Sequence, residues 1–229
     1  MRGLSRAAAL GVSGLLALPL AQGPALAAEG PAVDGPSAGQ LRDLAATLDV
    51  GAAFAADERR KARRVDTVRD PRGDAERIGM ARGPRPYTRL ADLTGVRYKT
   101  PSRVAGDVRI TTRWADLRDG RQRGVRRQTQ VTFLMGKREG EAWYVEVSNA
   151  DDRVRVHYIG NTRSESHRVR PEKVVVDRTF GPGGTTDLVL SSEWLDTRRV
   201  SMNTVSFAGD FRTFDATDLS RVLDVGPLR

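Results

Sequence analysis

The stretch that decides the fold is VTFLMGKREGEAWYVEVSNADDRVRVHYI, residues 131–159. Three runs in it, residues 131–135, 143–147 and 154–158, alternate residue by residue between two faces. A period of two residues is typical of β-strands with one buried face. Segments rich in Gly, Asn, Asp and charged residues separate the runs, as in hairpin turns. The stretch therefore predicts three antiparallel strands, joined in the order of the sequence.

The same alternation continues on both sides of this stretch. The further runs are residues 108–114, 174–176, 188–190 and 200–204. Turn-forming residues separate them, and no helical periodicity lies between them, as an α/β fold would require. About nine short strands with this spacing predict an all-β fold, a single antiparallel β-sandwich of jelly-roll-like type.

The N-terminus has the pattern of a secretory signal peptide. Arg2 and Arg6 precede an apolar run at residues 7–20, and Ala25-Leu26-Ala27 places small residues before a cleavage point. The run is shorter than the ~20 residues that span a bilayer. We therefore expect cleavage after Ala27 and a secreted, extracellular chain with no transmembrane segment.

Three parts follow from this reading: a signal peptide at residues 1–27, a flexible lead at 28–64 and a β-sandwich domain at 65–229. The lead begins rich in Pro, Gly and Ala. Leu41, Leu44 and Leu48 then recur at helical spacing, which indicates one short helix or a loosely held segment.

Composition narrows the chemistry that the chain can carry. The chain has no cysteine, so it forms no disulfide and carries no lipid-modified cysteine. Its formal net charge is +9, with arginine far in excess of lysine. This excess has two interpretations: a surface that binds anions, or the codon usage of a GC-rich genome.

The sequence contains no motif for catalysis. It has two histidines, His157 on the polar side of a predicted strand and His167 in a predicted polar loop, and no nucleophile elbow or phosphate-binding loop. We therefore expect no cofactor and a protein that is not an enzyme. The alternative enzyme is a sandwich glycoside hydrolase or lyase, which requires two facing carboxylates. The candidate carboxylates are Glu141, Glu146, Asp187 and Glu193.

The segment DPRGD, residues 70–74, has two interpretations: a metal site or a plain turn. Asp70 and Asp74 offer two carboxylates for calcium, which binds six to eight oxygen atoms, and Asp66 and Asp92 lie near in sequence. Asp-Pro and Gly-Asp are also ordinary turn formers. We expect a turn at the entry to the sheet, with Gly73 supplying backbone freedom and one aspartate accepting from local N–H groups; calcium is the alternative.

Arginines are dense in two further segments, in which we expect contacts to a polyanion. They are Arg121, Arg123, Arg126, Arg127, Arg153 and Arg155, with Arg163, Arg168 and Arg170 following. If these loops meet, they form a basic patch for an anionic polymer of the cell envelope. Few aromatic residues accompany them, so sequence-specific reading of nucleic acid is not expected. Sugar recognition would instead need exposed aromatic residues such as Tyr87, Tyr98 or Tyr144.

Several short segments resemble secreted actinobacterial β-sandwich proteins of uncharacterised function. The segments are DPRGD at 70–74, ADLTGVRY at 91–98, DVRITTRWADL at 107–117, LVLSSEWLDTRRVSM at 188–202 and FRTFDATD at 211–218. The resemblance implies a sandwich like those of carbohydrate-binding and DOMON-like modules. Some DOMON-like domains hold haem, but no pairing of methionine with histidine is visible here. The late cysteine pair of many such proteins is missing.

Together these features predict a secreted, non-catalytic binding or structural protein of the bacterial cell exterior. Its candidate ligand is an envelope polyanion. The alternatives are a carbohydrate-binding module and a sandwich-fold glycoside hydrolase or lyase.

Overall fold

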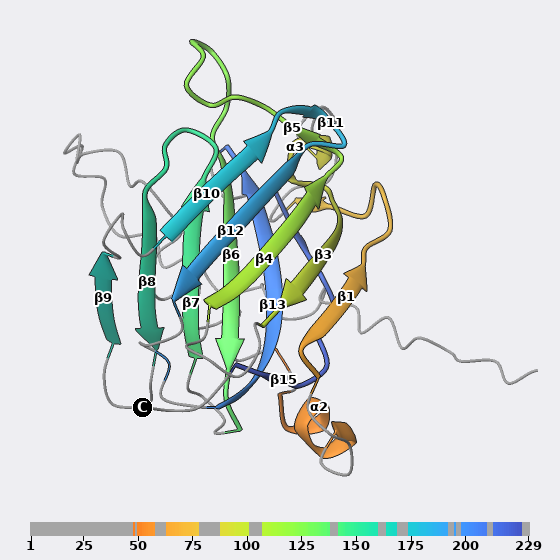
Figure 1. Cartoon of the computed structure of the whole chain (residues 1–229). Coiled ribbons are helices and arrows are strands. Elements are labelled where there is room, and N and C mark those ends of the chain that lie inside the picture. Colours follow the sequence, from red (N-terminus) through yellow and green to blue (C-terminus); the bar gives the residue numbers. More distant parts are fainter. Residues whose placement is uncertain are drawn as a thin grey trace, which may run out of the picture.

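The computed structural model describes residues 48, 50–57, 63–77, 88–100, 107–137, 142–159, 164–168, 174–191, 195, 198–209 and 213–225. These residues form two antiparallel sheets that pack face to face (Figure 1). The all-β sandwich predicted from the sequence is confirmed. The described part contains more strands than the nine or so expected, because β2, β5, β11 and β15 are only two residues long and carry no readable alternation.

The smaller sheet has five strands in the order β1-β3-β4-β12-β10. Its strands are β1 (Val65–Arg69), β3 (Leu93–Lys99), β4 (Asp107–Trp114), β12 (Thr185–Ser191) and β10 (Val174–Thr179). All neighbours pair antiparallel, and the register runs straight across the sheet apart from an irregularity between Leu93 and Gly95.

The larger sheet follows the order β2-β14-β13-β6-β7-β8-β9, with β15 also pairing with β13. Its strands are β2 (Glu76–Arg77), β14 (Thr213–Ala216), β13 (Arg199–Ala208), β6 (Gln128–Met135), β7 (Ala142–Ser148), β8 (Val154–Ile159), β9 (Ser164–Arg168) and β15 (Leu223–Asp224). A separate ribbon joins β5 (Asp116–Leu117) to β11 (Gly181–Pro182). The three strands expected at residues 131–159 are confirmed as β6, β7 and β8.

His167 does not lie in a polar loop, as the sequence predicted. It belongs to β9, where it pairs with Val156 of β8. The run Ser-Glu-Ser-His-Arg has no apolar alternation to mark a strand. This segment forms a strand because its main chain pairs with that of β8 at the edge of the sheet.

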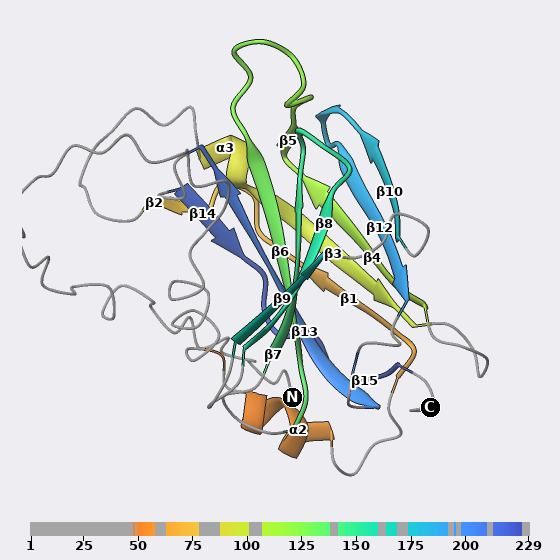
Figure 2. The ribbon, with the colours of Figure 1, turned by 90° about the vertical axis from the view of Figure 1, so that its left-hand side faces the viewer.

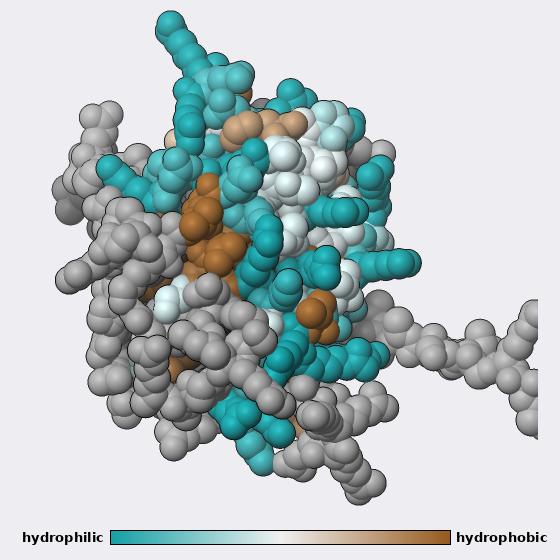
Figure 3. Space-filling view, in the orientation of Figure 1, coloured by the Kyte–Doolittle hydropathy of each residue, from teal (hydrophilic) through white to brown (hydrophobic). Residues whose placement is uncertain are grey.

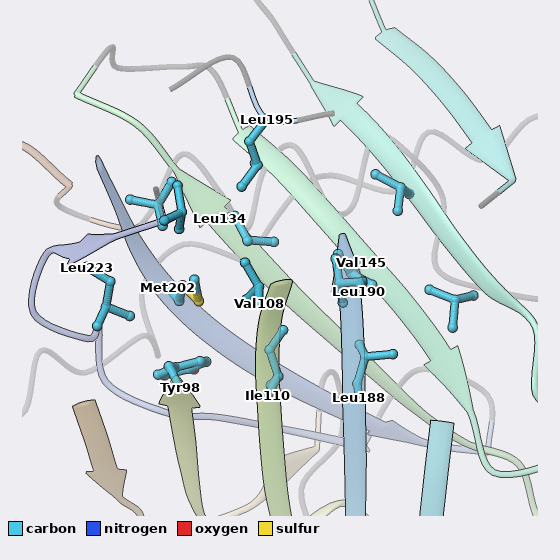
Figure 4. Packing of buried hydrophobic residues seen from close by; sticks show 14 of the residues in the cluster. Tyr98, Val108, Ile110, Leu134, Val145, Leu188, Leu190, Leu195, Met202 and Leu223 are labelled. Carbon is cyan, nitrogen blue, oxygen red and sulfur yellow. The ribbon is translucent and has the colours of Figure 1, made fainter. Parts of the chain in front are cut away.

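Apolar side chains from both sheets fill the space between them. Tyr98, Val108 and Ile110 of the smaller sheet face Leu134, Val145 and Met202 of the larger one (Figure 4). The apolar residues at alternate positions of β4, β7, β8, β12 and β13 are buried or packed against this core, whereas on β6 it is Leu134 that faces it. The solvent-facing positions of the smaller sheet are therefore known from the alternation.

A second apolar cluster covers the other face of the larger sheet. It contains Val131, Phe133 and Met135 of β6, together with Val205 and Phe207 of β13. Phe54 of helix α2 (Val50–Asp57) packs into it, and α2 lies at one end of this sheet (Figure 2). The lead thus contains a helix at Val50–Asp57, which the leucine spacing did not indicate. The helix predicted from Leu41 and Leu44 lies outside the described residues.

The other helix in the described residues is α3 (Thr88–Ala91), which precedes β3. Among the described residues, no helix is long and apolar enough to cross a membrane. The expected signal peptide at residues 1–27 lies outside the part that the structure describes.

Candidate metal centre

The segment DPRGD lies where the chain passes from one sheet to the other. Strand β1 of the smaller sheet ends at Arg69, and β2 of the larger sheet begins at Glu76. Gly73 adopts a φ of +84° in the turn between them, in the left-handed region that favours glycine. The expected turn is present, and it places Asp70 and Asp74 at the junction of the two sheets.

A third carboxylate joins these two from a distant part of the chain. One carboxylate oxygen each of Asp70, Asp74 and Asp215 lies within 4.8 Å of the others. Asp215 is on β14, which pairs directly with β2 just after the turn. We call these three residues the carboxylate corner. The sequence analysis missed Asp215, because only the pairing of β14 with β2 brings it to the turn.

Main-chain N–H groups hold the buried members of this region in place. The N–H of Leu93 donates to Asp215 Oδ2 at 2.6 Å, and that of Ala216 donates to Oδ1 at 2.9 Å. The N–H of Gly73 donates to both carboxylate oxygens of Asp92, each at 3.0 Å. The turn is thus held by Asp92, which directly precedes β3, and not by an aspartate of its own, as the sequence had suggested.

Burial and neighbouring carboxylates raise the pKa of two members of the corner, Asp70 and Asp215. Burial raises the pKa of Asp70 to about 8, and the neighbouring carboxylates of Asp215 and Asp74 add to the shift. Burial, followed by the charges of Asp74 and Asp92, raises the pKa of Asp215 to about 6, against the opposing hydrogen bond from Leu93 N–H. Asp70 Oδ2 is buried and receives no hydrogen bond from the described residues. Bringing these groups together as anions therefore costs free energy.

A hard metal cation, which prefers oxygen ligands, fits the three carboxylates of the corner. Calcium binds carboxylate and carbonyl oxygens in flexible arrangements of six to eight, whereas zinc prefers cysteine and histidine. Three aspartates from two segments, one of them a proline–glycine turn, offer calcium part of such a shell. A divalent cation would also remove the mutual repulsion of the carboxylates.

The loop arginines singled out in the sequence lie at one end of the sandwich. The β5–β6 loop and the β7–β8 turn meet there, because Gly120 N–H donates to the Asn149 carbonyl at 3.3 Å. The Asn149 side chain donates in turn to the Arg118 carbonyl at 2.8 Å. The loop that carries Arg121, Arg123, Arg126 and Arg127 therefore lies beside the turn that carries Arg153.

Aspartates of the same turn, however, neutralise part of this positive charge. Arg121 forms an ion pair with Asp152 at 2.9 Å, and Arg127 reaches Asp151 at 3.7 Å. Arg178 of β10, whose side chain is 5% exposed, binds Asp152 at 2.6 Å. We call this group of loops, with Arg178, the loop end. Polyanion binding by its arginines stays a prediction, on a surface of mixed charge.

Arg178 also fastens β10 to the β7–β8 turn. Its guanidinium donates to the main-chain carbonyls of Ser148 and Asp151, at 2.6 and 2.8 Å. Because β10 belongs to the smaller sheet and the turn to the larger one, this arginine links the two sheets. Of the other arginines considered, Arg155 pairs with Glu146 at 3.6 Å and Arg168 lies on β9, while Arg163 and Arg170 fall outside the described residues.

The carboxylates considered for glycoside hydrolysis do not come together in the described part of the chain. Glu146 lies on the outer face of the larger sheet, since its neighbours Val145 and Val147 face the core. Asp187 lies on the outer face of the smaller sheet, since Leu188 faces the core. The sandwich therefore separates these two, while Glu141 and Glu193 are outside the described residues.

The tyrosines considered for sugar recognition do not form an exposed platform. Tyr98 is completely buried, and its hydroxyl lies 2.9 Å from that of Thr204 inside the sandwich. Tyr144 is also buried and stacks on His157 with ring centroids 4.5 Å apart. Tyr87 lies outside the part that the structure describes.

No protein-family model matches the chain, and no curated protein matches it. The site is therefore interpreted from its own geometry.

Proposed function

We propose that the chain is a secreted, non-catalytic binding protein whose sandwich is closed at one corner by a calcium ion. The observation that carries this proposal is the convergence of Asp70, Asp74 and Asp215 within 4.8 Å. Three carboxylates at this distance, two of them with raised pKa values, are stable together only when protons or a cation neutralise them. At the calcium concentrations outside cells, the cation is the better neutralising agent near neutral pH.

The ion acts on the structure by tying the two sheets together. Asp70 follows β1 of the smaller sheet, and Asp215 lies on β14 of the larger one. A cation bound by both aspartates would oppose separation of the two sheets. It would add to the link that the hydrogen bond from Leu93 N–H to Asp215 already provides. Binding at a hundredfold excess over the dissociation constant would stabilise the fold by about 2.7 kcal/mol.

The proposal of secretion rests on the leader pattern at residues 1–27. The expected mature protein begins at Ala28. Sequencing the N-terminus of protein recovered from the culture medium checks this, and a cytosolic product that retains Met1 would contradict it.

Equilibrium dialysis with radioactive calcium tests the metal site. We expect one ion per wild-type chain and a loss of binding in Asp74→Asn and Asp215→Asn. Asp74 is exposed, so the first variant should fold even if the buried Asp215 does not tolerate the change. Asp152→Asn, at the loop end, is the matched control and should bind as wild type does. Equal binding in Asp74→Asn and wild type would refute the site.

A further inference from the structure

The solvent face of the smaller sheet carries a group of basic side chains outside both regions described so far. On β3, the core residues Val96 and Tyr98 alternate with exposed Arg97 and Lys99. Arg113 of β4 and Arg69 of β1 are exposed on the same face. We call Arg69, Arg97, Lys99 and Arg113 the basic face. Figure 3 views the molecule from this side and shows hydrophilic side chains over much of it.

The strand register brings these four side chains close together. Gly95 of β3 is the partner of Arg69 on one side and of Arg113 on the other, so no side chain stands between the two arginines. Arg97 is the residue two positions from Gly95 and therefore lies diagonal to both, at about 7–8 Å on an antiparallel sheet. Lys99 follows two residues further along the same strand.

Within the described residues, none of the four forms an ion pair. The neighbouring Arg109, in contrast, is paired with an acid, since its Nε donates to Asp187 Oδ1 at 2.9 Å. The Thr111 hydroxyl donates to the same oxygen. Of the described acids of this face, Asp177 lies on the edge strand β10. Asp187 lies on β12, diagonal to Arg113, but Arg109 and Thr111 already donate to it. Like charges that are diagonal or adjacent on a sheet repel one another, and an external anion would relieve this repulsion.

We propose that the basic face binds a linear, flexible phosphodiester polymer without bases. Three of its four cations are arginines, whose planar guanidinium groups pair with phosphate through two parallel hydrogen bonds. The four named side chains include no aromatic ring on which a base could stack. Because antiparallel sheets twist, a flexible chain can follow the cations where a flat bilayer would touch only some of them.

The phosphodiester polymer would be the ligand of the proposed binding protein, so this proposal rests on the proposed function. The basic face and the carboxylate corner share no residue, so each can fail without the other. Binding should therefore be measured both with a chelator and with millimolar calcium. Calcium-independent binding to the polymer would leave the basic face supported even if the metal site is refuted.

The test measures binding of synthetic poly(glycerol phosphate) to the full mature chain across a salt series. For four neutralised phosphates, a slope of about −3 is expected in a plot of log affinity against log salt, from about −0.7 per phosphate on single strands. Between 50 and 200 mM salt, affinity would then fall about 50-fold. No binding at 50 mM salt would overturn the proposal.

Two double variants of equal charge change locate the binding surface. Arg97→Glu/Arg113→Glu should weaken binding at least tenfold, while Arg123→Glu/Arg153→Glu at the loop end should change it less than threefold. Equal losses in both would show that net charge, and not the basic face, decides affinity. Arg97→Gln/Arg113→Gln replaces the first variant if thermal unfolding shows that it does not fold, and the same ordering against the control is expected.

Two further probes test the class of partner. Duplex DNA and vesicles containing anionic phosphatidylglycerol are compared with poly(glycerol phosphate) at equal phosphate concentration. The proposal expects the tightest binding to the polymer. Tighter binding to either of the others would overturn the assignment to a flexible polymer without bases.

Discussion

The carboxylate corner and the loop end are both built from charged side chains of distant segments, but their charges are arranged in opposite ways. At the loop end, Asp152 accepts from Arg121 and Arg178, and these contacts lower its pKa, the hydrogen bond from Arg178 most of all. At the corner, burial first and neighbouring carboxylates second raise the pKa values of Asp70 and Asp215 to about 8 and about 6. In the first region Asp151 and Asp152 are each paired with arginine, whereas the second region needs a proton or a cation.

This difference separates a structural cluster from a binding site. Opposite charges that meet inside the folded chain satisfy each other and leave little for a ligand. Like charges that are held together by the fold carry an unfavourable energy that a ligand of opposite charge can remove. By the same reasoning, the basic face is a better candidate for anion binding than the loop arginines are.

The largest expected effect is the loss of the buried arginine that links the sheets at the loop end. Arg178→Ala removes three charged hydrogen bonds and leaves the Ser148 and Asp151 carbonyls without this donor. We expect a loss of about 3 kcal/mol in the free energy of unfolding, measured with urea. Arg121→Ala is the control, since its exposed pair with Asp152 should contribute less than 1 kcal/mol.

The two regions should respond to pH in opposite directions. The raised pKa values of Asp70 and Asp215 mean that the folded, metal-free protein binds more protons than the unfolded chain above about pH 4. Stability in a chelator should therefore fall as pH rises from about 4 to 8, by about 2 kcal/mol after solvent screening. Asp70→Asn should flatten this fall.

The lowered pKa of Asp152 contributes with the opposite sign, since the stability that it supplies is lost as pH falls through its folded pKa. Urea unfolding at each pH, with and without calcium, separates these effects. A metal-free protein whose stability does not change between pH 5 and 8 would contradict the electrostatic account of the corner.

The same type of substitution, aspartate to asparagine, should change the stability of the fold in opposite directions at the two sites. In a chelator, Asp152→Asn should destabilise the protein by about 1 kcal/mol, because it weakens charged hydrogen bonds to Arg121 and Arg178. Asp74→Asn should stabilise it by about 0.5 kcal/mol, because it removes one of the repelling charges near Asp70. A destabilising Asp74→Asn without metal would mean that its carboxylate is already compensated.

The strands could be predicted where alternation is strong, and the charged sites only where their members are close in sequence. Asp70 and Asp74 were recognised because five residues contain both. Asp215 could not be, since its place beside them depends on β14 pairing with β2. Strand β9 was missed because its residues are polar on both faces.

The basic face could not be predicted from the sequence for a similar reason. Alternation on β3 does predict that Arg97 and Lys99 point outward, but their proximity to Arg69 and Arg113 depends on the register across three strands. The loop arginines were favoured because they are dense along the chain. Sequence density did not reveal that Asp151 and Asp152 would meet them, which only the closing of the two loops brings about.

Thermal unfolding with and without calcium tests the central claim most directly. Wild type in a chelator is compared with wild type in 5 mM calcium and in 5 mM magnesium, beside Asp74→Asn and Asp152→Asn. The account predicts that calcium raises the Tm of wild type and of Asp152→Asn by about 5 °C or more, and that Asp74→Asn loses most of this shift. A wild-type Tm that calcium leaves unchanged, or a shift as large in Asp74→Asn as in wild type, would contradict it.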